Sequence, residues 1–200
     1  MPEKEKLRLF VAIFPPAHLV AGLHTAALEL QKRWPARAVR WTRSNQIHLT
    51  LNFLGAVAAA RLPEMESVLR AACQRHRRQA VRVAGLGCFP NASRPRILWA
   101  GLAGDLRPLA ELKKAMDDGF AASGFVGEDR PFHAHLTIGR VPELNAAGRR
   151  ELAEALAGEQ NRDFGEWELG RVDLMESVLS PQGATYTPLK SIALEDRQCP

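Results

Sequence analysis

The chain has 200 residues, 46% of them hydrophobic, which is enough for one compact domain with a sizeable core. Its three cysteines are widely spaced and no apolar run approaches ~18 residues, so neither a disulfide framework, a zinc knuckle nor a membrane span is indicated. The N-terminal charges are followed by neither a long apolar segment nor a small-residue cleavage site, so we expect a soluble cytoplasmic protein. The net charge is +5 and 21 of the 27 basic residues are arginine, which mildly favours phosphate-bearing partners.

The first half of the chain has the pattern β-α-β-β-α. A buried strand is predicted at Arg8–Phe14, and the two prolines after it open a helix that continues to Leu30. A short strand at "VRWT" and a longer one at Ile47–Leu54 follow. A second helix carries Leu62, Met65, Val68, Leu69 and Ala72 on one face.

The second half mixes strands and helices in the same way. Strands are predicted at Val81–Leu86, Ile97–Gly101, around His135, at Trp167–Leu179 and at Tyr186–Leu194. Helices are predicted at Leu106–Ser123 and Asn145–Ala157. The pattern as a whole predicts an α+β fold in a single domain that spans residues 1–200.

Two of the predicted strands carry the same short motif. In "QIHLTLNFLG", the side chains of Gln46, His48, Thr50 and Asn52 share one face of a regular strand. In "FHAHLTIGR", His135 and Thr137 repeat the pair. One His-x-Thr is more often an ordinary half-exposed strand, but two in a chain of this composition are not expected by chance. An internal duplication with pseudo-twofold symmetry would bring both polar faces to one cleft.

Such a cleft suits chemistry at phosphorus. Two imidazoles with ordinary pKa values near ~6.5 can work as one general base and one general acid, while two hydroxyls hold non-bridging oxygens. Zinc would need more ligands than His133-x-His135 supplies, and the chain has no P-loop, GxGxxG or GxSxG. The pattern therefore indicates metal-free phosphoester chemistry.

The chain resembles the two-histidine (2H) phosphoesterases, and among them the bacterial and archaeal RNA 2′,3′-cyclic phosphodiesterases of the 2′-5′ RNA ligase type. The resemblance rests on "RLFVAIFPP", "RWTRSNQIHLTLNFLG", "GCFPNASRPRILWAGL", "RPFHAHLTIGR" and "YTPLKSIAL", in this order. It implies a bilobal, internally duplicated fold of two antiparallel sheets facing a central groove, with helices outside. It also implies hydrolysis of a terminal 2′,3′-cyclic phosphate to a 2′-phosphate, and reversible ATP-independent 2′-5′ joining of RNA ends.

The resemblance also implies roles for individual residues. His48 would be the proton donor and His135 the proton acceptor, while Thr50, Thr137 and Arg140 would bind substrate, with no metal and no cofactor. Strict alternation puts Arg140 on the far face from Thr137, so a bulge or strand end near Gly139 is needed to bring it in. Ala134 stands where the family often has proline. The implied partners are RNA ends with a 2′,3′-cyclic phosphate, tRNA fragments among them, or cyclic nucleotides, and we expect a monomer with no membrane contact.

Two other functions remain open from the sequence. One is a non-catalytic module that binds RNA ends, and the other is a phosphodiesterase for small cyclic or 2′-5′-linked nucleotides. His133 is expected to be exposed on its strand. Trp41, Trp99 and Phe10 are expected either in the core or at the edge of the groove, where an aromatic ring could stack a base. Arg94 and Arg96 fit RNA phosphates and a solvated turn equally well.

Overall fold

The computed structural model describes residues 6–33, 39–125, 131–181 and 183–196. The helices in these ranges are α1 (Ala17–Arg33), α2 (Leu62–Cys73), α3 (Arg107–Ala122) and α4 (Ala146–Ala157). The strands are β1 (Lys6–Ile13), β2 (Arg40–Trp41), β3 (Leu49–Ala58), β4 (Gln79–Phe89), β5 (Ile97–Ala103), β6 (His135–Arg140), β7 (Asp163–Leu169), β8 (Arg171–Ser180) and β9 (Gly183–Ala193). The predicted α+β class is confirmed.

The strands in the described ranges form one curled antiparallel sheet. Its order is β7-β4-β5-β6-β3-β1-β8-β9, and β2 pairs with β6. The two central strands, β3 and β6, are joined by the Leu49–Leu136 pair. The resemblance implied two separate sheets, but the Leu49–Leu136 pair joins them into one. The pattern of the sequence does not predict this pairing between β3 and β6. Register shifts in the long ladders add the local bending that curls the sheet.

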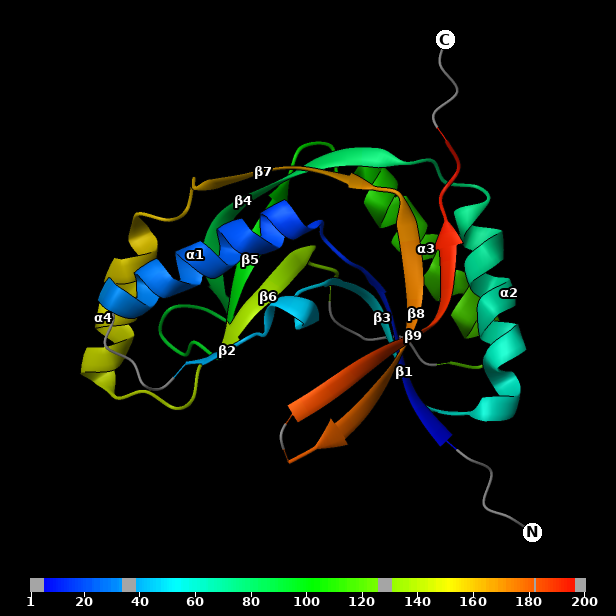
Figure 1. Cartoon of the computed structure of the whole chain (residues 1–200), viewed down its shortest axis with the longest axis horizontal. Helices are drawn as coiled ribbons and strands as arrows, with labels where there is room; N and C mark the ends of the chain where they lie inside the picture. Colours follow the sequence, from blue (N-terminus) through cyan, green and yellow to red (C-terminus); the bar gives the residue numbers. More distant parts are fainter. Residues whose placement is uncertain (1–5, 34–38, 126–130, 182, 197–200) are drawn as a thin grey trace.

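The helices lie as two pairs. Figure 1 shows α1 with α4 at one end of the molecule and α2 with α3 at the other. Pro63 and Pro108 open α2 and α3, where a missing backbone donor costs nothing, and the Asn145 side chain accepts a hydrogen bond from the Gly148 N–H to cap α4. No helix in the described ranges is both long and apolar enough to cross a membrane.

One core cluster connects all four helices with one face of the sheet. The sheet contributes Leu49 and Leu136 to this core, and both are fully buried. The opposite face of the sheet carries a separate small cluster of Phe10, Ala12 and Met175, with Phe14 and Tyr186 packed against it. We call the face with this small cluster the groove face.

The chain crosses between the two halves of the sheet. Helix α1 follows β1 but packs against β6 and β7, while α3 follows β5 and packs against β3. After α2 the chain enters the other half of the sheet, where β4 pairs with β5. Near the C-terminal end it returns, and β8 pairs with β1. These crossings pack the two halves into one body.

One predicted strand is wrong in its bounds. The segment Trp167–Leu179 was expected to be continuous, but β7 begins at Asp163 and ends at Leu169, and β8 begins at Arg171. Gly170 forms the corner between them. The two apolar stretches run together in the sequence because Gly170 is the sole turn residue between them.

Candidate active site

The two His-x-Thr motifs lie side by side where the halves of the sheet meet. Because Leu49 opposes Leu136 in an antiparallel pair, the register brings His48 next to Thr137 and Thr50 next to His135. Leu49 and Leu136 point into the core, so the four motif side chains point to the groove face. The pairing of Thr50 with Ala12 agrees with this assignment.

Both histidines make the same hydrogen bond. The Nδ1 atom of His48 lies 2.7 Å from the carbonyl oxygen of Gln46, and the Nδ1 atom of His135 lies 2.7 Å from that of His133. A carbonyl oxygen only accepts, so each Nδ1 carries the proton. In a neutral ring this leaves Nε2 with its lone pair, and in a charged ring it leaves Nε2–H as the donor.

The imidazole of His48 lies among aromatic rings. Its centroid is 5.1 Å from that of Phe10, 5.4 Å from that of Phe14 and 5.4 Å from that of Tyr186, which meets it edge-on. Tyr186 comes from the β8–β9 hairpin, and the Gln46 side-chain amide donates to the Ala184 carbonyl of the same hairpin at 2.5 Å. The hairpin therefore fixes both the ring of His48 and the segment that orients it.

Burial lowers the pKa of His48 to about 4. The hydrogen bond to the Gln46 carbonyl opposes this shift, and the nearby His135 imidazole adds to it because two positive charges repel. Burial also lowers the pKa of His135, by less, against the hydrogen bond to the His133 carbonyl and together with repulsion from the His133 ring. In the unliganded protein, His135 is therefore the easier of the two to protonate.

The surroundings of His135 are less crowded with aromatic rings. Phe89 meets its ring edge-on at 5.0 Å and also lies 5.2 Å from the indole of Trp99, which pairs with Thr137 across the ladder. A Cβ at Gly87 would lie 2.4 Å from the Trp99 ring, so glycine there lets the indole lie against the sheet. Of the two positions open to Trp99 from the sequence, the core and the edge of the groove, the ring takes the groove face.

The groove face continues past each threonine through a β-bulge. Thr50 pairs with Ala12 but Asn52 with Val11, so Leu51 is an extra residue in β3. Thr137 pairs with Trp99 but Gly139 with Leu98, so Ile138 is an extra residue in β6. Each bulge shifts the alternation of the side chains that follow it.

These bulges decide which side chains join the motif. Asn52 was expected beside Thr50, but it turns to the helix side and its amide donates to Asp117 of α3 at 2.6 Å. Gly139 faces Val39 and Trp41, and Val141 is buried in the core, so Arg140 between them points to the groove face. The bulge that Arg140 required is present.

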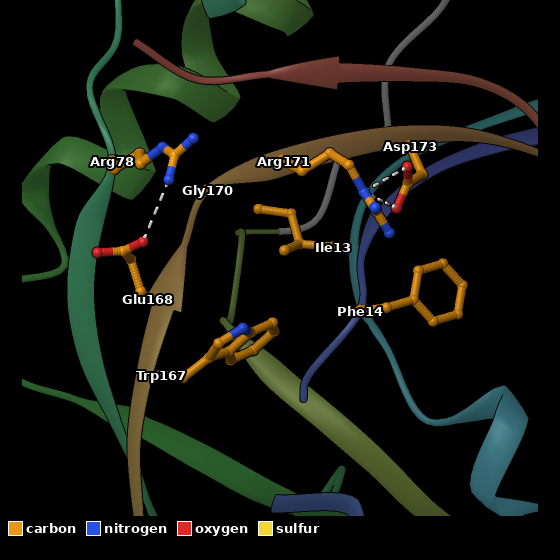
Figure 2. Close-up of a pocket in the computed structure, with 8 residues that line it drawn as sticks. All are labelled: Ile13, Phe14, Arg78, Trp167, Glu168, Gly170, Arg171 and Asp173. Carbon is orange, nitrogen blue, oxygen red and sulfur yellow. Dashed lines mark hydrogen bonds and ion pairs between the residues drawn. The ribbon is translucent and has the colours of Figure 1, made fainter. Parts of the chain in front are cut away.

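A pocket of about 250 Å³ adjoins the His48 side of this site (Figure 2). It lies where β1 ends and where β7 turns into β8, and Phe14, which contacts His48, is one of its walls. Its arginines face carboxylates: Arg78 pairs with Glu168 and Asp196, and Arg171 with Asp173. Each positive charge in this pocket is therefore balanced by an acidic neighbour.

A model of the 2′-5′ RNA ligase superfamily matches residues 15–180. The chain belongs to this superfamily. The RNA 2′,3′-cyclic phosphodiesterase of Methanothermobacter thermautotrophicus is 29% identical over 191 residues, covering 94% of this chain and 100% of that protein. The protein of the same name from Thermus thermophilus is 30% identical over 192 residues, covering 94% and 90%. The crystal structure of Escherichia coli LigT complexed with 3′-AMP has a TM-score of 0.76 and 26% identity, covering 95% of this chain and 99% of that one.

In this superfamily member, the structure brings together every residue that the sequence assigned to the site. His48, Thr50, His135, Thr137 and Arg140 all lie on the groove face of two adjacent strands. Within the described residues, the Thr50 and Thr137 hydroxyls have no hydrogen-bond partner, which leaves them available to a ligand. Nor do three or more His, Cys, Asp or Glu side chains gather there as a candidate metal centre.

Sequence reasoning missed the residues that hold the histidines in place. The Gln46 and His133 carbonyls stand two residues before His48 and His135, a spacing that is visible in the sequence but carries no residue-type signal. Tyr186 reaches His48 only through the fold of the hairpin. His133 is exposed as expected, and its ring packs 5.7 Å from Phe89.

Proposed function

We propose that the protein hydrolyses the terminal 2′,3′-cyclic phosphate of RNA to a 2′-phosphate, without a metal or cofactor. The proposal rests mainly on the equivalent arrangement of the two imidazoles on antiparallel strands. Each is held through Nδ1 by a backbone carbonyl two residues earlier, and each has a threonine of the other strand beside it. Two identically oriented titrating groups are what acid–base catalysis requires, whereas binding alone has no need of them.

The reaction moves one proton on each side of phosphorus. Nε2 of His135 takes a proton from a water molecule whose oxygen bonds to phosphorus, and the bond from phosphorus to the 3′ oxygen breaks in line with it. Nε2–H of His48 gives its proton to that departing oxygen, which becomes the 3′-hydroxyl. Exchange of both protons with solvent restores the pair.

The role of His48 as the acid depends on the substrate. With its pKa at about 4, His48 is neutral in the unliganded protein near pH 7. The cyclic phosphate carries a negative charge, and an anion next to an imidazole raises its pKa. Binding of the substrate therefore supplies the charge that keeps His48 protonated for the step in which it is needed.

Thr50, Thr137 and Arg140 are the proposed substrate-binding residues. A hydroxyl on each side of the histidines donates to one non-bridging oxygen, and these bonds strengthen as charge builds up on phosphorus. Arg140 adds a guanidinium, whose planar fork matches phosphate oxygens. With the 5′-hydroxyl of a second RNA end in place of water, the same steps join the two ends through a 2′-5′ bond, without ATP.

The architecture supports an internal duplication within this single domain. Each motif has its own backbone carbonyl that orients the histidine, its own bulge after the threonine and its own neighbouring crossover helix. We therefore regard residues 1–200 as two pseudo-symmetric lobes of one domain. A monomeric state and a cytoplasmic location remain predictions, which size-exclusion chromatography with light scattering and cell fractionation would test.

The test uses an oligoribonucleotide that ends in a 2′,3′-cyclic phosphate, incubated with the protein in EDTA. Turnover to a product that phosphorus NMR identifies as the 2′-phosphate supports the proposal. Tight binding without turnover would instead indicate a module that only holds RNA ends. Loss of activity in EDTA that zinc or magnesium restores would contradict the metal-free mechanism.

A further inference from the structure

Two arginines face each other beyond the motif residues. In the ladder between β2 and β6, Arg40 is directly opposite Arg140, and Ile97 of β5 flanks Arg140 on its other side. Both arginines are exposed. Figure 1 shows β2 beside β6. β2 pairs with the same edge of β6 as β3 does, while β5 pairs with the other edge. Arg40 and Arg140 therefore continue the line along which the two motifs meet.

Arg40 points to the groove face, as Arg140 does. Its neighbours Val39 and Trp41 both pack against the core, so the side chain between them is on the opposite face of the strand. Directly opposed residues of an antiparallel pair also share a face. Arg140 comes three residues after Thr137, which places the arginine pair about 10 Å along the strand from Thr137 and from His48 beside it, and farther from His135.

The arginine pair has no acidic partner within the described residues. Arg82, Arg162 and Arg171 each form ion pairs, whereas no carboxylate of the described residues pairs with Arg40 or Arg140. Like charges directly opposite each other across a ladder repel. An anion bound between them removes this repulsion and satisfies both guanidinium forks.

We infer that Arg40 binds the backbone phosphate of the nucleotide next to the RNA terminus. This inference rests on the proposed function and specifies its substrate as an oligonucleotide end in preference to a free cyclic mononucleotide. A mononucleotide has no phosphate beyond the reacting one, so it cannot reach Arg40 from the histidine pair. An RNA chain has such a phosphate at every step, and its negative charge complements the arginine pair.

The experiment compares kcat/KM for a 2′,3′-cyclic mononucleotide with that for a trinucleotide ending in the same group. Wild type, Arg40→Gln, Arg40→Lys and Arg140→Gln are measured over a series of salt concentrations. Arg150→Gln is the matched control, because Arg150 is an exposed arginine of α4 whose removal changes the net charge equally. Circular dichroism melting checks that each variant is folded.

We expect wild type to prefer the trinucleotide. Arg40→Gln lowers kcat/KM for the trinucleotide about tenfold while changing it less than about twofold for the mononucleotide. Arg40→Gln also reduces the slope of log kcat/KM against log salt concentration by roughly 0.7, the value for one phosphate contact on a single strand. Arg40→Lys keeps the wild-type slope.

Equal losses on both substrates, or no loss on either, would overturn the inference, as would a wild type without preference. In each of these cases the protein still hydrolyses a cyclic phosphate, so the proposed function stands. If wild type turns over neither substrate, the proposed function itself fails, and the inference fails with it.

Discussion

Leu51 of β3 and Ile138 of β6 are equivalent residues: each is the extra residue of a β-bulge directly after the threonine of a His-x-Thr motif. Both side chains are buried in the core. The bulges place Phe53 and Arg140 at corresponding positions on the groove face, Phe53 beside Phe10 and Arg140 beside Arg40. The two halves of the site are thus alike at the reacting centre and different beyond it, with an aromatic side and a basic side.

Alanine at either histidine should abolish most of the activity. If His48 and His135 each transfer a proton, His48→Ala and His135→Ala each lower kcat by about 10²–10⁴-fold. His24→Ala is the control, because His24 is exposed on α1 and lies outside the site. Steady-state kinetics on a cyclic-phosphate oligonucleotide measures the effect, and a variant with either histidine removed that keeps wild-type activity would disprove the assignment.

Removal of a threonine hydroxyl should cost less. Thr50→Val and Thr137→Val keep the branched shape that suits a strand, so the change isolates the donor. Loss of one donor to the charged phosphate oxygens lowers kcat by about 10–10³-fold. Thr25→Val on α1 is the control, since the Thr25 hydroxyl bonds only its own helix. An unchanged rate in both groove variants would mean that the hydroxyls do not contact the phosphate.

The value of kcat/KM should begin to decrease with rising pH at an unusually low pH. The pKa of His48 is about 4 and that of His135 is lowered from 6.5, so above pH 6.5 both imidazoles of the free protein are neutral and the acid is missing. We expect kcat/KM, which reports the free enzyme, to drop about tenfold per pH unit there. The maximum of kcat lies at higher pH, because the bound phosphate favours the charged imidazole. A kcat/KM that stays level well above pH 6.5 would contradict these shifts.

The sequence predicted the reacting centre better than its surroundings. A repeated His-x-Thr on two alternating strands identifies His48 and His135, because periodicity alone fixes which side chains share a face. It does not reveal bulges, so Asn52 was placed on the wrong face, and Arg140 could be brought in only by assuming one. The contact between Tyr186 and His48 depends on the pairing of distant strands, which no local pattern encodes.

The burial of His48 should also make the free energy of unfolding depend on pH. In the unfolded chain its pKa is near 6.5, and in the folded protein it is about 4. Between these values the unfolded chain binds a proton that the folded protein does not, so the free energy of unfolding decreases as the pH falls through this window. The full effect is on the order of 3 kcal/mol and is absent above the window.

Urea unfolding of wild type and His48→Gln over this pH range measures that contribution. The glutamine variant lacks the titrating ring, so its stability should decline less on acidification than that of wild type. Parallel curves for the two proteins would mean that the imidazole of His48 is not desolvated in the folded state.

The most direct test of the acid–base pair replaces the departing 3′ oxygen of the substrate by sulfur. A thiolate with a pKa near ~8.5 leaves without a proton donor, so the missing acid no longer matters while the missing base still does. On this 3′-thio substrate, His48→Ala should recover most of the rate it loses on the natural one, and His135→Ala should stay slow. Recovery of His135→Ala instead would exchange the two roles. Recovery of neither variant would contradict proton transfer by the histidines.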